Sequence, residues 1–161
     1  MTRYHTQKWV GYAALLLLLV VLRSGTRADV HSLYGQTLYV PVYSEIPYGD
    51  RDRTIELTAT LSIRNTDRKV TMTVQRVDYY NAQGQLVRAY VREPRALPAL
   101  AAVEFVIKAS DRSGGISASF IVVWESDTLC VPPVVEAVML STASTQGISF
   151  SGQARVVEEK R

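Results

Sequence analysis

A strict two-residue alternation between Ile55 and Arg64 limits the folds open to this chain more than any other feature of its sequence. Apolar side chains occupy the odd positions from 55 to 63, and polar side chains occupy the even positions from 56 to 64. Successive side chains of a strand point to opposite faces, so the pattern predicts an antiparallel strand with one buried and one solvent-facing side. Burial of each larger apolar side chain contributes about 1.5–3 kcal/mol. A slip of one residue would expose them all, so the pattern is expected to set the register firmly.

Seven further segments combine apolar runs or alternation with turn residues at their ends, and they also predict strands. The segment 117–125 is apolar on both faces, which is typical of a central strand. Pro41 predicts that its own segment is an edge strand, because proline cannot donate to a ladder. The apolar phase slips near Gln75–Arg76, which predicts a β-bulge, and Gly84 is the expected left-handed residue of a tight hairpin. The seven segments are 37–43, 70–79, 85–91, 103–107, 117–125, 134–140 and 147–158.

Short strands at regular spacing, separated by turn residues, predict an all-β fold. We expect a single antiparallel β-sandwich over residues 36–158. The Cys…Trp…Cys spacing of an immunoglobulin domain proper is lacking, so the expected topology is immunoglobulin-like or fibronectin-like. Residues 29–35, which include His31, are expected to form a flexible tail.

Residues 1–28 have the layout of an export signal or a membrane-anchor helix. Val10–Leu22 is an uncharged, leucine-rich run preceded by Arg3 and Lys8, and Thr26-Arg27-Ala28 has small residues at the −3 and −1 positions of a cleavage site. The run is shorter than the roughly 20 residues of a spanning helix, which favours a cleaved signal peptide. Two arginines after the run leave an uncleaved anchor as the alternative. Either way, the rest of the chain is expected in the periplasm or cell envelope, held at the inner membrane if the anchor is retained.

The basic character of the chain belongs to this leader. Of the 18 Lys and Arg residues, four lie within residues 1–28, which contain no acidic residue, so 14 basic residues face 15 acidic ones in the remainder. Nucleic-acid binding needs clustered basic residues against phosphates, and none is therefore expected of the folded part. Membrane contact is expected only through the N-terminal segment, if it stays uncleaved.

Histidine and cysteine are too scarce for the common catalytic and zinc sites. His31 is the only histidine beyond the leader, and Cys130 is the only cysteine of the chain. Nucleophilic triads need a positioned base, and zinc sites need several such ligands. We therefore predict no catalytic residues, no metal site and no cofactor. Cys130 is expected to be a small packed side chain, with a reactive thiol as the alternative.

Candidate binding residues come from exposed tyrosines and from one charged loop. Tyrosine is enriched at recognition surfaces, and Tyr43, Tyr48 and Tyr80 are the best candidates for an exposed patch, although tyrosine is also an ordinary strand residue. Asp50 and Asp52 lie in the loop that enters the strongest strand. The arginines beside them favour an ion-paired loop, and Ca²⁺ binding is the other interpretation.

Two further positions have both a structural and a functional interpretation. The glycine pair within residues 111–115 allows an anion-binding nest or a plain turn. Glu136 shares a strand face with apolar residues such as Val138, where an unpaired carboxylate would be costly. It is expected at a water-exposed edge, paired with Arg64 or Arg76, or as a functional carboxylate in a groove.

Six short motifs follow one another along the chain. They are YVPVYS at 39–44, TLSIRNTD at 60–67, VDYY at 77–80, SGG at 113–115, FIVVW at 120–124 and PPVVEAVM at 132–139. In this order they resemble a bacterial family called domain of unknown function 3124, over about residues 36–158. The resemblance implies a small exported protein with no assigned activity and no established functional residues. Many members are lipid-anchored, but this chain lacks the lipid-attachment cysteine near its leader.

Together these features predict a non-catalytic binding or structural module of the bacterial cell envelope. Its partner would be an envelope protein or polymer whose identity the sequence does not give. One alternative is a hydrolase acting on envelope glycan through paired carboxylates such as Glu125, Asp127 and Glu136. Another is a carrier of a small ligand or metal.

Overall fold

The described part of the chain consists of strands and the turns between them. The computed structural model describes residues 31–49, 53–142 and 147–161. These ranges contain twelve strands and no helix, so they offer no helical segment able to cross a membrane. The strands are β1 (Leu33–Val42), β2 (Glu45–Tyr48), β3 (Arg53–Glu56), β4 (Thr58–Arg64), β5 (Met72–Tyr80), β6 (Leu86–Ala89), β7 (Arg95–Leu97), β8 (Ala102–Ile107), β9 (Ala118–Cys130), β10 (Val134–Ser141), β11 (Ile148–Gln153) and β12 (Arg155–Lys160).

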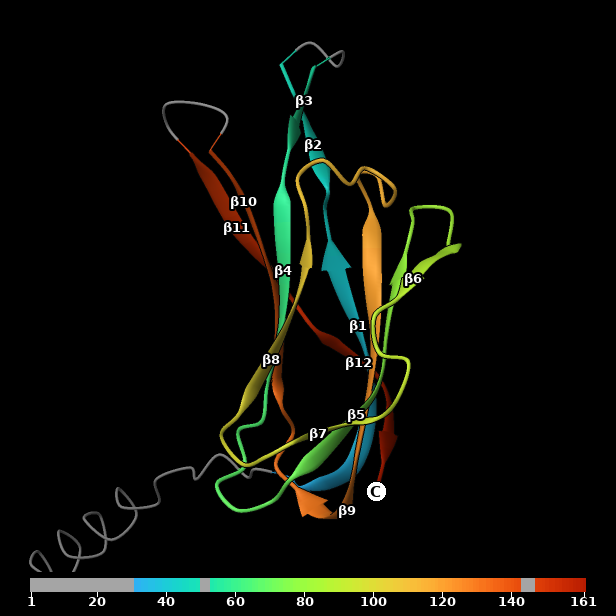
Figure 1. Cartoon of the computed structure of the whole chain (residues 1–161), viewed down its shortest axis with the longest axis vertical. Helices are drawn as coiled ribbons and strands as arrows, with labels where there is room; N and C mark the ends of the chain where they lie inside the picture. The colour runs from blue at the N-terminus through green and yellow to red at the C-terminus, as the bar shows by residue number, and fades with distance from the viewer. Residues whose placement is uncertain (1–30, 50–52, 143–146) are drawn as a thin grey trace, which may run out of the picture. The chain divides into compact units, whose positions relative to one another are not determined.

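These strands form two larger antiparallel sheets and one hairpin (Figure 1). The first sheet has the order β12-β1-β9-β5-β6, with β7 also paired to β5, and the second has the order β11-β10-β4-β8. The buried residues of both sheets belong to one hydrophobic core, which is a sandwich-like arrangement. The prediction of an all-β fold with antiparallel sheets is thus confirmed. The immunoglobulin-like or fibronectin-like topology stays a prediction, and the signal or anchor helix lies outside the described residues.

The alternating segment contains a central strand of the second sheet. Its apolar residues Leu57, Ala59, Leu61 and Ile63 are fully buried, and β4 lies between β10 and β8. The segment is not one continuous strand, because the part before Leu57 is β3, which pairs with β2 in a hairpin that was not predicted. The polar face is also less exposed than expected: Ser62 is buried, since it has a neighbouring strand on each side.

The predicted bulge in β5 and the predicted central position of β9 are confirmed, but β9 continues to Cys130, beyond the predicted end at Glu125. β9 lies between β1 and β5, and its residues Phe120 and Val122 are fully buried. The register between β5 and β9 shifts within residues 74–76, which is the predicted bulge. In the turn from β5 to β6, Gly84 has a φ of 75°, the left-handed conformation that glycine adopts without strain.

The prediction that Pro41 marks an edge strand is wrong. β1 lies inside the first sheet, between β12 and β9. However, β12 pairs with β1 only from Gly35 to Tyr39. Beyond Tyr39 the strand has a ladder partner on the β9 side alone, so it is locally an edge and tolerates a residue without an N–H group.

Both ends of the domain differ from the expected boundaries. β1 begins at Leu33, inside the segment 29–35 that was expected to be a tail, and Leu33 is buried opposite Cys130 of β9. The C-terminal segment 147–158 contains two strands, β11 in the second sheet and β12 in the first. The chain changes sheets at Ala154, whose N–H donates to the carbonyl of Val135 at 3.1 Å. Alternation predicts the face that a strand buries, but not the sheet that it joins.

Candidate functional site

Residues 111–115, here called the glycine loop, lie at one end of the domain (Figure 1) and form hydrogen bonds with neighbouring segments there. The N–H and the hydroxyl of Ser44 both donate to the carbonyl of Gly115, at 3.3 and 2.9 Å. The N–H of Ala82, in the turn after β5, donates to the carbonyl of Gly114 at 3.2 Å. The glycine loop therefore joins the end of β1 to the turn between β5 and β6.

The glycine loop rests on a buried tyrosine. A Cβ atom at Gly114 would overlap the hydroxyl of Tyr79 and would lie 2.7 Å from the Cβ of Ala118, so no larger residue fits there. Tyr79 is fully buried and packs against Phe120, with ring centroids 5.2 Å apart. Burial raises the pKa of Tyr79, and the nearby hydroxyl of Ser44 opposes part of this effect. The two glycines thus serve close packing and a turn.

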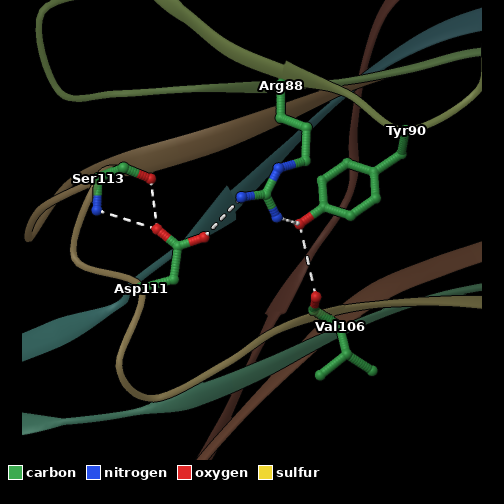
Figure 2. A network of polar contacts seen from close by, with 5 residues as sticks. All are labelled: Arg88, Tyr90, Val106, Asp111 and Ser113. Carbon is green, nitrogen blue, oxygen red and sulfur yellow. Dashed lines mark hydrogen bonds and ion pairs between the residues drawn. The ribbon is translucent and has the colours of Figure 1, made fainter.

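A polar network beside the glycine loop holds Arg88 of β6 in place (Figure 2). The N–H and hydroxyl of Ser113 both donate to Oδ1 of Asp111. The guanidinium of Arg88 donates to Oδ2 of Asp111 at 3.1 Å and to the hydroxyl of Tyr90 at 3.2 Å. It also lies over the Tyr90 ring, 5.4 Å from the centroid, and the Tyr90 hydroxyl donates to the carbonyl of Val106 at 3.4 Å. Three segments of the chain, at residues 88–90, 106 and 111–113, therefore position one guanidinium.

These contacts favour the charged forms of Asp111 and Arg88. The hydroxyl of Ser113, followed by its N–H and by Arg88, lowers the pKa of Asp111 against the opposing effect of burial. The hydrogen bond with Tyr90 raises the pKa of Arg88. The side chain of Arg88 is 49% exposed, so it faces solvent while its orientation is held. The two hydrogen bonds use only part of the five N–H donors of a guanidinium.

An open hollow of about 540 Å³ lies beside Arg88 and the glycine loop. Arg112, on its rim, forms an ion pair with Glu56 of β3, and this contact raises the pKa of Arg112. Lys108 has no ion-pair partner among the described residues. The lining combines apolar, hydroxyl-bearing and charged side chains, namely Val87, Val106, Ser110, Ser113, Arg88, Lys108, Asp111 and Arg112.

The predicted binding residues are only partly brought together at this end. Tyr48 is exposed in the β2–β3 hairpin. Tyr80 is half-buried at the end of β5, close to the turn that contacts the glycine loop. Tyr43 is also half-buried, and it packs edge-on against a phenylalanine of β11 with centroids 5.7 Å apart. Asp50 and Asp52 lie outside the described residues.

Glu136 lies on the outer face of the second sheet. It pairs with Arg64 of β4, with Nη1 and Oε1 2.5 Å apart, so one of the expected ion pairs is confirmed. The other expected partner, Arg76, pairs with Asp78 at 3.2 Å. In β10 the residues directly before and after Glu136 face the core. Because side chains alternate along a strand, Glu136 and the apolar residues that share its face point toward the surface.

The other groups considered for chemistry are divided between the two sheets. Glu125 and Asp127 belong to β9 of the first sheet, and Glu136 belongs to β10 of the second. Glu125 pairs with Lys160 at 3.1 Å. The described ranges contain no group of three or more potential metal ligands. Cys130 is fully buried, as predicted, and burial raises the pKa of its thiol to about 11.

Arg88, Tyr90 and Lys108 were missed by reasoning from the sequence. Arg88 and Asp111 are 23 positions apart, and no local pattern links a residue of β6 to the loop after β8. The only signal was the glycine pair within residues 111–115, which was interpreted as an anion-binding nest or a plain turn. The N–H groups of Ser113 and Gly115 bond within the loop, which favours the turn.

Comparison with known proteins gives a family match and a similarity to a solved structure. The profile of a family described as "Protein of unknown function (DUF3124)" matches residues 35–157, close to the extent expected from the motifs. A structure titled "Crystal Structure of Thermotoga maritima 1070" is 15% identical in sequence, with a TM-score of 0.49, and the similarity covers 78% of this chain and 97% of that chain. No curated protein matches the chain.

Proposed function

The chain belongs to the DUF3124 family of proteins of unknown function, and from this premise we propose that it is a non-catalytic binding module exported to the bacterial cell envelope. In this proposal the domain is an immunoglobulin-like or fibronectin-like sandwich. Its partner is an envelope protein or polymer, which it contacts through the end of the domain that carries the glycine loop.

The hydrogen-bonded rim of the 540 Å³ hollow is the observation that carries this proposal. The glycine loop is bonded to Ser44 and to Ala82, and Arg88 is held by Asp111 and Tyr90. Groups that are already ordered lose less conformational entropy when a partner binds. Recognition residues are also commonly found on loops that a rigid scaffold positions. A polar rim of this kind is therefore suited to binding.

The leader supports the location. An uncharged, leucine-rich run after two basic residues is typical of export. An exported domain with a single cysteine gains no stability from an internal disulfide, and the continuous core over both sheets supplies that stability instead.

A capture experiment with the full chain tests the proposal. The chain is expressed with its leader in a bacterial host, isolated from the envelope fraction and used to capture envelope proteins and polymers. Arg88→Ala, on the rim, should abolish capture, and the matched control Arg68→Ala, in the loop between β4 and β5, should leave it intact. Equal capture by both variants would contradict a contact through the rim. Turnover of envelope glycan by the purified protein would contradict a non-catalytic role.

A second hollow favours the carrier function as another candidate. It has a volume of about 340 Å³ and is lined mostly by apolar residues, with Gln36, Glu136 and Gln153 as its polar groups. Small-molecule sites commonly combine an apolar lining with a few polar groups. Native mass spectrometry of the isolated protein tests this candidate: a bound small molecule would support it, and the mass of the bare chain would count against it.

A further inference from the structure

We propose that the hollow beside the glycine loop binds an anionic group, a carboxylate or a phosphate, carried by the partner. This inference rests on the proposed function, because it names the chemistry that the rim recognises. Three lines of observation support it: the charge balance of the lining, the geometry of Arg88, and the way in which Asp111 is already engaged.

The charge balance of the hollow is positive. Arg88, Lys108 and Arg112 line it together with a single carboxylate, that of Asp111. Arg112 is compensated by Glu56 outside the lining, and Arg88 is compensated by Asp111. The ammonium group of Lys108 has no ion-pair partner in the described ranges. An anion that enters the hollow therefore supplies the counter-charge that the protein itself does not.

The geometry of Arg88 suits a planar or tetrahedral oxyanion. Asp111 and Tyr90 each accept one hydrogen bond, from different terminal nitrogens of the guanidinium, and the planar guanidinium fork keeps further N–H donors in the same plane. Such a fork binds two oxygens of a carboxylate or phosphate together. Ser110 adds a hydroxyl to the lining, and Val87 and Val106 add apolar surface that can contact the carbon skeleton of the carrier.

The opposite assignment, a cation site, is disfavoured by the contacts of Asp111. Its Oδ1 accepts two hydrogen bonds from Ser113, and its Oδ2 accepts one from Arg88. A metal cation would have to displace Arg88 and would meet two further positive side chains. The carboxylate thus serves to orient Arg88 and leaves the hollow to an anion.

Small-anion titration of the envelope-isolated full chain tests the inference. Inorganic phosphate and acetate are the two probes, with sodium chloride at matched ionic strength as the reference, and binding is followed through the amide NMR signals of Lys108, Ser110 and Ser113. We expect saturable shifts with at least one probe. Lys108→Gln should weaken binding about tenfold, which corresponds to the loss of one charge-assisted hydrogen bond. A response to phosphate alone assigns a phosphate-bearing partner, and a response to acetate alone assigns a carboxylate-bearing one.

Lys69→Gln is the matched control, because it removes the same charge from an exposed position between β4 and β5. If both lysine variants weaken anion binding equally, the effect of Lys108 is only long-range electrostatic attraction, and the proposal of a specific anion site is overturned. The absence of saturable shifts with either probe would also overturn it. If the anions do not bind but envelope capture still depends on Arg88, the anion assignment is wrong and the proposed binding function stands.

Discussion

Asn65→Ala should strongly destabilise the domain, because one buried side chain joins two loops at the end opposite the glycine loop. Asn65 is 2% exposed. Its Nδ2 donates to the carbonyls of Val70, Leu97 and Pro98 at 2.9, 3.0 and 3.0 Å. Its Oδ1 accepts the N–H of Asp67 at 3.0 Å. The side chain therefore connects the loop after β4 to the segment between β7 and β8.

The size of the loss in the free energy of unfolding follows from the backbone groups that lose their hydrogen-bond partner in the alanine variant. A buried polar group without a partner costs about 1–3 kcal/mol, and an ordinary hydrogen bond contributes about 0.5–1.5 kcal/mol. The bond to the carbonyl of Leu97 is fully buried, and those to Val70 and Pro98 are partly so. We therefore expect the free energy of unfolding to fall by about 3–5 kcal/mol. This is a large share of the roughly 5–15 kcal/mol that stabilises a typical domain.

Urea unfolding followed by the fluorescence of the buried Trp124 measures this loss. With a slope of about 1–3 kcal/mol per molar urea, the midpoint should fall by more than about 1 M. Asn81→Ala is the matched control: the Oδ1 of Asn81 accepts two backbone N–H groups at 3.0 and 2.9 Å, but these bonds are exposed. It should lose less than about 1.5 kcal/mol. The reasoning is refuted if Asn65→Ala loses no more than Asn81→Ala.

Three further predictions concern single buried groups. Tyr79→Phe should keep or slightly raise the melting temperature, because the buried hydroxyl of Tyr79 makes no hydrogen bond within the described residues and the nearby Ser44 hydroxyl donates to the carbonyl of Gly115 instead. A marked fall would show that the Tyr79 hydroxyl is satisfied, by Ser44 or by another group. Burial raises the pKa of Cys130 from 9.0 to about 11, so the thiol of the native protein should react slowly with iodoacetamide near neutral pH. The stability that the neutral thiol contributes should be lost as the pH rises from 9.0 to about 11. Fast alkylation of the folded protein would contradict this. The backbone N–H of Val131, then that of Lys69, lowers the pKa of Asp67 below 3.8, so its ionised form stabilises the fold above pH 3.8 and this contribution is lost as pH falls through the lower folded value. Asp67→Asn should therefore melt with a weaker dependence on acid pH than the parent chain, and equal dependence in calorimetry would refute the assignment.

The features of the fold that depend on residues close together in the sequence could be predicted. The alternation from Leu57 to Ile63 predicts which side chains reach the core, and all of its apolar members are buried. The bulge within residues 74–76 and the left-handed turn at Gly84 follow from a local change of phase and from the freedom of glycine. The pairing of Glu136 with Arg64 was predictable as one of several alternatives, because a carboxylate on an apolar strand face needs a partner or water.

The amino-acid sequence by itself determined the strand class, the buried faces and the turns, because each of these depends on a short window of residues. Only the tertiary structure decided which strands became neighbours: a two-residue period is the same in either sheet, so the change of sheet at Ala154 has no local signal. For the same reason, the candidate site could not be predicted from local sequence patterns. Arg88 and Asp111 meet because β6 and the loop after β8 are brought to one rim by the packing of the whole domain.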